Sequence, residues 1–183
     1  MNKKPTFALM AMLLPGSVFA HNLNVGDALP NVVVADKGEI TLQDDKIVYQ
    51  DWNSEQLAGK VRVIQAIAGR SSAKALNADL MSAITAADFP NEQYQTTTII
   101  NQDDAIWGTG SFVKSSAEDS KRDFSWSSMV LDANGTVHQS WQLAAEDSAI
   151  IVLDKSSHVL FVKEGKLSSQ EIEQALELVK SNL

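Results

Sequence analysis

The segment Gly69-Arg70-Ser71-Ser72-Ala73-Lys74 carries the side chains of this chain that are best placed for chemistry. It follows an apolar run and precedes a helical pattern, so its free backbone N–H groups would point outward at the positive end of a helix dipole. Arg70 and Lys74 add cationic donors, and Ser71 and Ser72 add hydroxyls. The segment therefore predicts a pocket for an anionic group.

The same segment has two alternative interpretations. Ser71 and Lys74 have the S-x-x-K spacing of the serine nucleophile and lysine in penicillin-recognising enzymes, which would make the protein a small periplasmic hydrolase. The Lys-Thr-Gly triplet of those enzymes is absent, and no Ser-Asp-Asn triplet lies in the required order. In the simpler alternative, Ser71 or Ser72 is only the N-cap of a helix, and Arg70 and Lys74 are solvated surface charges.

Two further groups of residues could bind a metal. Asn101, Asp103 and Asp104 follow a β-branched run, at the edge of a sheet where α/β proteins often place ligands. Their carboxylates could hold a hard cation, but turn formation and helix capping explain them more simply. His21 would become N-terminal after processing and could bind copper, but only two other histidines are available as partners. We therefore expect no metal and no cofactor.

The four tryptophans could line a groove for a peptide or a sugar. Packing in the core or half-burial is the commoner role of such residues. Trp107 differs from the others because it stands beside Gly108 and Gly110, which favours an exposed position.

The elements that must position these residues alternate between strands and helices. Residues 61–68 are apolar almost throughout and predict a buried central strand, and the β-branched run 96–100 predicts a second one. Between them, Ala73, Leu76, Leu80 and Ile84 form one stripe of a helix.

Turn signals predict three hairpins. The paired segments are 40–42 with 47–49, 129–131 with 137–141 around Asn134-Gly135, and 149–153 with 159–162. Ser168 and Glu171 form a capping box that opens a C-terminal helix. The polar region 101–121 has no clear period and is left unassigned.

Composition excludes several classes of function. The chain has no cysteine, so it cannot perform dithiol exchange, use a peroxidatic sulfur or bind metal through thiolates. Its 183 residues include 15 basic and 23 acidic side chains, a net charge of −8. An acidic surface repels nucleic acid and anionic lipid, so we expect neither as a partner.

The first twenty residues have the layout of a cleaved secretory signal. Lys3 and Lys4 precede a short apolar core at 7–14, and small residues at 18 and 20 precede a cut before His21. That core is far shorter than the ~20 residues of a membrane-spanning helix, and no later segment is apolar enough to span a bilayer. We expect a protein exported to the periplasm, with a single domain over residues 21–183.

Several motifs are typical of one group of exported proteins. Val25-Gly-Asp-Ala-Leu-Pro30 resembles the opening segment of thioredoxin-like and peroxiredoxin-like proteins, and Leu57-x-Gly-Lys60 resembles their lead-in to the first central strand. Val152-Leu-Asp154, Gly165 and the capped helix are similar to their C-terminal half. With the 69–74 and 101–104 segments, nearly the whole chain resembles the YtfJ-type family of exported bacterial thioredoxin-like proteins, which has no firmly assigned biochemical role.

This resemblance implies an α/β, thioredoxin-like fold: a central mixed sheet flanked by helices, with an N-terminal β-hairpin extension. It places Ser71 and Lys74 at the positions of the two redox cysteines of active thioredoxins, and Ser148 at the position of their cis-proline. A serine hydroxyl cannot make a reversible disulfide, so no thiol-disulfide oxidoreductase or peroxidase activity is expected.

We therefore expect a binding or interaction module that uses the former active-site edge. Its partner would be an envelope protein, a peptide or a small anionic ligand. A purely structural accessory of an envelope complex is the remaining alternative, and it predicts an exposed apolar patch. The candidate ligand-binding residues are Gly69, Arg70, Ser71, Ser72, Lys74, Asp104, Trp107 and Ser148.

Overall fold

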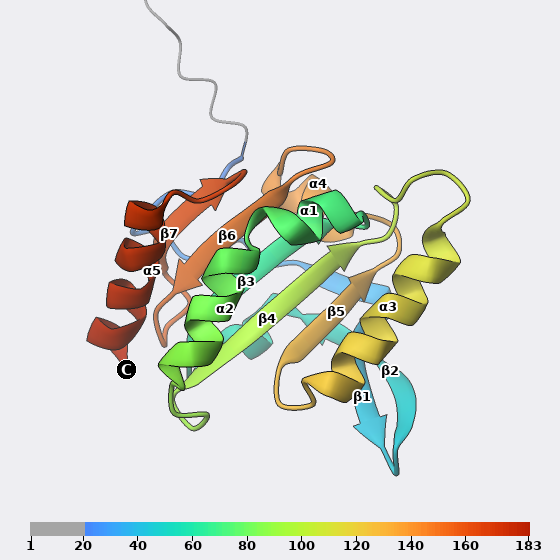
Figure 1. The fold of residues 1–183 in the computed structure, drawn as a ribbon, viewed down its shortest axis with the longest axis horizontal. Coiled ribbons are helices and arrows are strands. Elements are labelled where there is room, and N and C mark those ends of the chain that lie inside the picture. Colours follow the sequence, from blue (N-terminus) through green and yellow to red (C-terminus); the bar gives the residue numbers. More distant parts are fainter. Residues whose placement is uncertain (1–20) are drawn as a thin grey trace, which may run out of the picture.

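A computed structural model describes residues 21–183, which form a seven-stranded sheet with helices on both faces (Figure 1). The predicted signal peptide, residues 1–20, lies outside the described residues. The strands are β1 (Val33–Gln43), β2 (Lys46–Asn53), β3 (Val61–Ala68), β4 (Tyr94–Asn101), β5 (Ser128–Asp132), β6 (Ser148–Leu153) and β7 (Val159–Glu164). The helices are the short 3-10 helix η1 (Ser54–Leu57), α1 (Ser71–Leu76), α2 (Ala78–Ala87), α3 (Gly110–Asp123), α4 (Thr136–Trp141) and α5 (Ser169–Asn182).

The strand order is β2-β1-β5-β4-β3-β6-β7. The three central strands β3, β4 and β5 are parallel, and the outer strands pair antiparallel. All eight residues of β3 are buried, as expected for an apolar strand covered on both faces. Both predicted central strands are confirmed, as are the β1–β2 and β6–β7 hairpins.

The two faces of the sheet are covered differently (Figure 1). The front face, towards the viewer in Figure 1, carries α1, α2, α3 and α5, and α4 lies behind the sheet. The core behind the sheet is continuous and includes Trp52, Ile64, Ile99 and Trp141. The front face has two separate cores, one that joins α2 and α5 to β3 and β6, and one that packs Ala117 of α3 against β5.

The predicted helix over residues 73–84 is two helices. Ala73, Leu80 and Ile84 are buried as expected, but the chain breaks at Asn77 between α1 and α2. The Asn77 side chain is buried and donates to Ser148 Oγ and Gly165 O, and it accepts from the Leu167 N–H, each at 3.0 Å. These bonds to the β6–β7 region hold the helix break in place.

The predicted hairpin around Asn134-Gly135 is wrong in its second half. Gly135 adopts a left-handed conformation (φ 67°), and residues 136–141 form α4 instead of a strand. The Asp132 carboxylate accepts hydrogen bonds from the backbone N–H groups of Thr136 and Val137 at 2.9 and 2.8 Å and so caps this helix. Val137 and Trp141, spaced four residues apart, then reach the same core.

The polar region that the sequence left unassigned contains most of α3. Within α3, only Ala117 and Lys121 are buried. The predicted capping box is confirmed at α5, where Ser168 and Glu171 bond reciprocally. Within residues 21–183, no helix is long and apolar enough to cross a membrane.

Candidate functional site: a cleft between α2 and α3

The segment that the sequence singles out lies where β3 passes into α1. The N-cap position is Arg70, which makes no side-chain cap, so the expectation that Ser71 or Ser72 is the N-cap is wrong. Both serines are exposed in the first turn. Gly69 donates its N–H to Asn101 O at 2.7 Å, and a Cβ there would lie 2.8 Å from the same oxygen. Glycine is therefore required for β3 and β4 to approach at this end.

The guanidinium of Arg70 is already engaged by two acidic residues. It lies 3.0 Å from Asp104 Oδ1 and 3.1 Å from Glu146 Oε1, and its Nε donates to the Asp104 carbonyl at 2.9 Å. These bonds tie the loop after β4 to the loop before β6. Arg70 thus has less capacity for an external anion than the sequence suggests.

The acidic run after β4 forms a turn. Asn101 Oδ1 accepts from the backbone N–H groups of Asp103 and Asp104 at 3.1 and 3.3 Å. Among residues 21–183, no group of three or more histidine or acidic side chains could hold a metal ion.

Ser148 and Trp107 have opposite environments. Ser148 is fully buried at the start of β6, opposite Ile67, where it accepts the hydrogen bond from Asn77. No peptide bond in residues 21–183 is cis. Trp107 is 97 % exposed in the β4–α3 loop, as its glycine neighbours suggested.

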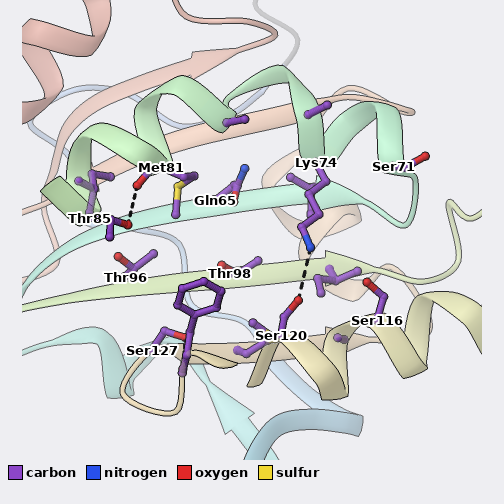
Figure 2. Close-up of a pocket in the computed structure, with 18 of the residues that line it drawn as sticks. Gln65, Ser71, Lys74, Met81, Thr85, Thr96, Thr98, Ser116, Ser120 and Ser127 are labelled. Carbon is purple, nitrogen blue, oxygen red and sulfur yellow. Dashed lines mark hydrogen bonds between the residues drawn. The ribbon is translucent and has the colours of Figure 1, made fainter. Parts of the chain in front are cut away.

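A cleft of about 1070 Å³ opens on the front face between α1–α2 and α3 (Figure 2). Its lining includes Gly69, Arg70, Ser71 and Lys74 of the predicted site. The other four predicted residues, Ser72, Asp104, Trp107 and Ser148, do not line it. The sequence prediction thus found one end of the cleft.

The floor of the cleft is polar. Gln65 of β3 pairs in register with Thr98 of β4, and Thr96 lies two residues before Thr98. Gln65 is only 4 % exposed, and its Nε2 has no hydrogen-bond partner. Figure 2 shows the Gln65 side chain rising from β3 towards α1 and α2, beside Met81 and Lys74. The two threonines lie on β4, which is uncovered between α2 and α3 (Figure 1), whereas Gln65 lies beneath α1 and α2.

The walls of the cleft are largely apolar, with hydroxyls among them. Met81 and Phe89 line it from α2 and the following loop. Phe124 and Trp126 line it on the other side, with ring centroids 5.5 Å apart and planes at 80°. Lys74 reaches across to α3, where its Nζ lies 3.4 Å from Ser120 Oγ (Figure 2).

The hydrolase alternative gains no support from this geometry. Within residues 21–183 no hydrogen bond joins Lys74 to Ser71, and Figure 2 shows the two side chains pointing in different directions, that of Lys74 towards Ser120. The pair thus lacks the direct contact that a serine nucleophile and its lysine base ordinarily make.

Gln65, Thr96 and Thr98 were not among the site residues predicted from the sequence. The signal available was a polar residue inside an apolar strand and a threonine run in the neighbouring strand. Alternate residues of a strand share a face, so Gln65 would be expected on the same face as Val63 and Ile67. A buried polar residue in such a row is more informative than an exposed one.

The fold and the cysteine-free start of α1 define a class of proteins: thioredoxin-like proteins without redox cysteines. The thioredoxin domain of a thiol-disulfide oxidoreductase from Bacteroides vulgatus is similar, with a TM-score of 0.57, 14 % identity, and coverage of 88 % of this chain and 99 % of that one. A thiol-disulfide isomerase from Corynebacterium glutamicum is also similar, with a TM-score of 0.56, 14 % identity, and coverage of 86 % and 96 %. At such identities the likeness shows the fold alone.

The chain belongs to the YtfJ family, whose model, described as a bacterial protein of unknown function, matches residues 23–182. It is 45 % identical to the uncharacterised protein YtfJ of Escherichia coli strain K12 over the full length of both. It is 48 % identical to an uncharacterised protein of Haemophilus influenzae, with 97 % of each chain covered. The resemblance inferred from the sequence motifs is confirmed.

Proposed function

We propose that this chain is an exported periplasmic binding protein that holds its ligand in the cleft between α2 and α3. The signal-like pattern of residues 1–20 supports export. The absence of cysteine excludes the thiol chemistry of the similar oxidoreductases, so a binding role for the fold is the simpler one. Gly69, Arg70, Ser71 and Lys74 form one end of the proposed site.

The observation that carries this proposal is the unpartnered amide of Gln65. A buried donor without an acceptor costs about 1–3 kcal/mol, and nearly all buried polar groups in proteins have a partner. Gln65 lines the cleft but its Nε2 is closed to solvent, so a ligand acceptor would recover this cost when the amide turns towards the cleft. The ligand therefore carries a hydrogen-bond acceptor at the floor of the cleft and apolar groups against its walls.

The test uses 8-anilinonaphthalene-1-sulfonate, an apolar anion, as a probe of the cleft, with binding measured by calorimetry. Ser116 lines the cleft, and the adjacent Ser115 does not, although both are exposed on α3. Ser116→Phe is expected to weaken binding of the probe, and Ser115→Phe is the matched control that leaves it unchanged. The proposal is wrong if the probe does not bind, or if both variants bind it as tightly as the original protein.

A further inference from the structure

We infer that the ligand in this cleft is an extended peptide that presents a carboxylate to Lys74. This inference rests on the proposed binding function and specifies the ligand class. It follows from three features of the cleft: the spacing of its polar floor, the chemistry of its walls and the charge near one end.

The floor repeats at the spacing of an extended main chain. Thr96 and Thr98 are alternate residues of β4, so their side chains share a face about 6.6 Å apart. The main-chain N–H and C=O groups on one edge of an extended peptide recur at the same interval. A peptide along β4 could therefore meet the Thr98 hydroxyl, and the Thr96 hydroxyl beside its bond to Tyr94 at 2.9 Å, with equivalent groups. A carbonyl of the same peptide would bond to the buried Gln65 amide once that side chain turns towards the cleft.

The other ligand chemistries fit this floor and these walls less well. A hydrocarbon chain would leave Gln65 Nε2 and the Thr98 hydroxyl without partners, whereas the Thr96 hydroxyl is already bonded to the Tyr94 hydroxyl at 2.9 Å. An inorganic anion would leave the apolar walls unfilled. A peptide suits both the polar floor and the apolar walls, because its main chain would bond to the floor while its apolar side chains contact Met81, Phe89 and Trp126. Methionine adapts to side chains of different shape, which suits a site for varied peptides.

The charge of the cleft selects a carboxylate. The protein carries a net charge of −8, yet the lining has two cations, Arg70 and Lys74, and one acidic residue, Asp88. Arg70 is neutralised by its two ion pairs, whereas the ammonium of Lys74 contacts only a neutral hydroxyl at 3.4 Å within the described residues. A carboxylate in place of that hydroxyl would form a charge-assisted hydrogen bond.

The carboxylate could belong to the C-terminus of the peptide or to an acidic side chain, and three acetylated tetrapeptides separate these sources. They are Leu-Thr-Phe-Ala with a free carboxyl, the same peptide as its amide, and Leu-Thr-Phe-Glu as its amide. Binding of each to the purified protein is measured by calorimetry. We expect one or both acids to bind about three to ten times more tightly than the alanine amide.

Two variants tie this preference to the named residues. Lys74→Met is expected to abolish the preference for the acids, and Lys180→Met, on the exposed face of α5, is the matched control that keeps it. Gln65→Leu is expected to weaken all three peptides alike. A preference that survives in Lys74→Met would overturn the assignment.

The outcomes also separate this inference from the proposed function. If the apolar anion binds in a Ser116-dependent manner but no peptide binds or displaces it, the peptide assignment is wrong and the binding function stands. Equal binding of acids and amide contradicts the role given to Lys74. If neither the apolar anion nor any peptide binds, both proposals fail.

Discussion

Asn77 Nδ2 donates a hydrogen bond to Ser148 Oγ at 3.0 Å, across 71 residues of sequence, with both side chains buried. The resemblance to thioredoxin-like proteins implies that Ser148 occupies the position of their cis-proline. In this chain the position links the break between α1 and α2 to the β6–β7 region. Ser148 therefore has a structural partner in this chain.

Asn77→Ala is therefore expected to lower the free energy of unfolding by about 2–3 kcal/mol, because it leaves the Leu167 N–H and the Gly165 carbonyl without their partner. Ser148→Ala should cost only about 1 kcal/mol, since the bond from Asn77 to Gly165 remains. Urea denaturation measures both variants. The exposed Asn91→Ala is the control and should stay within about 0.5 kcal/mol. Equal costs for the two buried variants would contradict this account.

Gln65→Leu is expected to stabilise the unliganded protein by about 1 kcal/mol, because it removes a buried donor that lacks an acceptor. Thermal and urea denaturation without ligand give the measurement. Thr98→Val is the comparison, since the half-buried Thr98 hydroxyl is accessible to water and its loss should change little. If Gln65→Leu destabilises the protein, the amide has a partner in the free state, and the argument for a ligand there is lost.

The fold was predictable where burial follows a simple period. Residues 61–68 are apolar and fully buried, and the stripe through Leu80 and Ile84 meets the core as expected. The hairpin predicted at Asn134-Gly135 was wrong in its second half because a left-handed glycine can precede a helix as well as close a hairpin. The helix at 110–123 was not predicted from the sequence, because Ala117 is its only buried apolar residue.

The site was predictable only in part, for a physical reason. Residues 69–74 are contiguous, so their charged and hydroxyl side chains can be recognised as a group in the sequence. The floor of the cleft joins Gln65 to Thr98, whose proximity depends on the parallel register of β3 and β4. The ion pair between Arg70 and Asp104 likewise depends on how two loops meet. Both relationships are tertiary and leave no local pattern.

The resemblance places Ser71 and Lys74 at the positions of a redox pair, and this prediction can be tested by introducing cysteines there. The two residues are three apart at the start of α1, so their side chains lie on the same side of the helix. We expect Ser71→Cys with Lys74→Cys to form an intrachain disulfide under mild oxidation, as detected by mass spectrometry and loss of free thiols.

The matched control is Ser72→Cys with Lys74→Cys, in which the cysteines are two residues apart and point to different sides of the helix. This pair should remain reduced under the same conditions. Equal oxidation of both pairs would show that α1 unwinds readily. Failure of the first pair to oxidise would mean that the start of α1 does not have the geometry of a Cys-x-x-Cys helix.

The fully buried Asp132 carboxylate makes the stability of the protein depend on pH. Burial raises the pKa of Asp132 above its ordinary value of 3.8, an effect that the hydrogen bonds from Val137 and Thr136 only partly offset. Between the unfolded and the folded pKa, the folded protein binds more protons at this site, so stability falls as pH rises through that interval.

In Asp132→Asn, which keeps an oxygen to cap α4, this dependence should disappear. Urea denaturation from pH 3 upwards measures the difference between the two proteins. The original protein should lose stability relative to Asp132→Asn as pH rises and reach a plateau above the folded pKa. A relative gain with rising pH would instead mean that the two capping bonds outweigh burial and lower the pKa of this carboxyl.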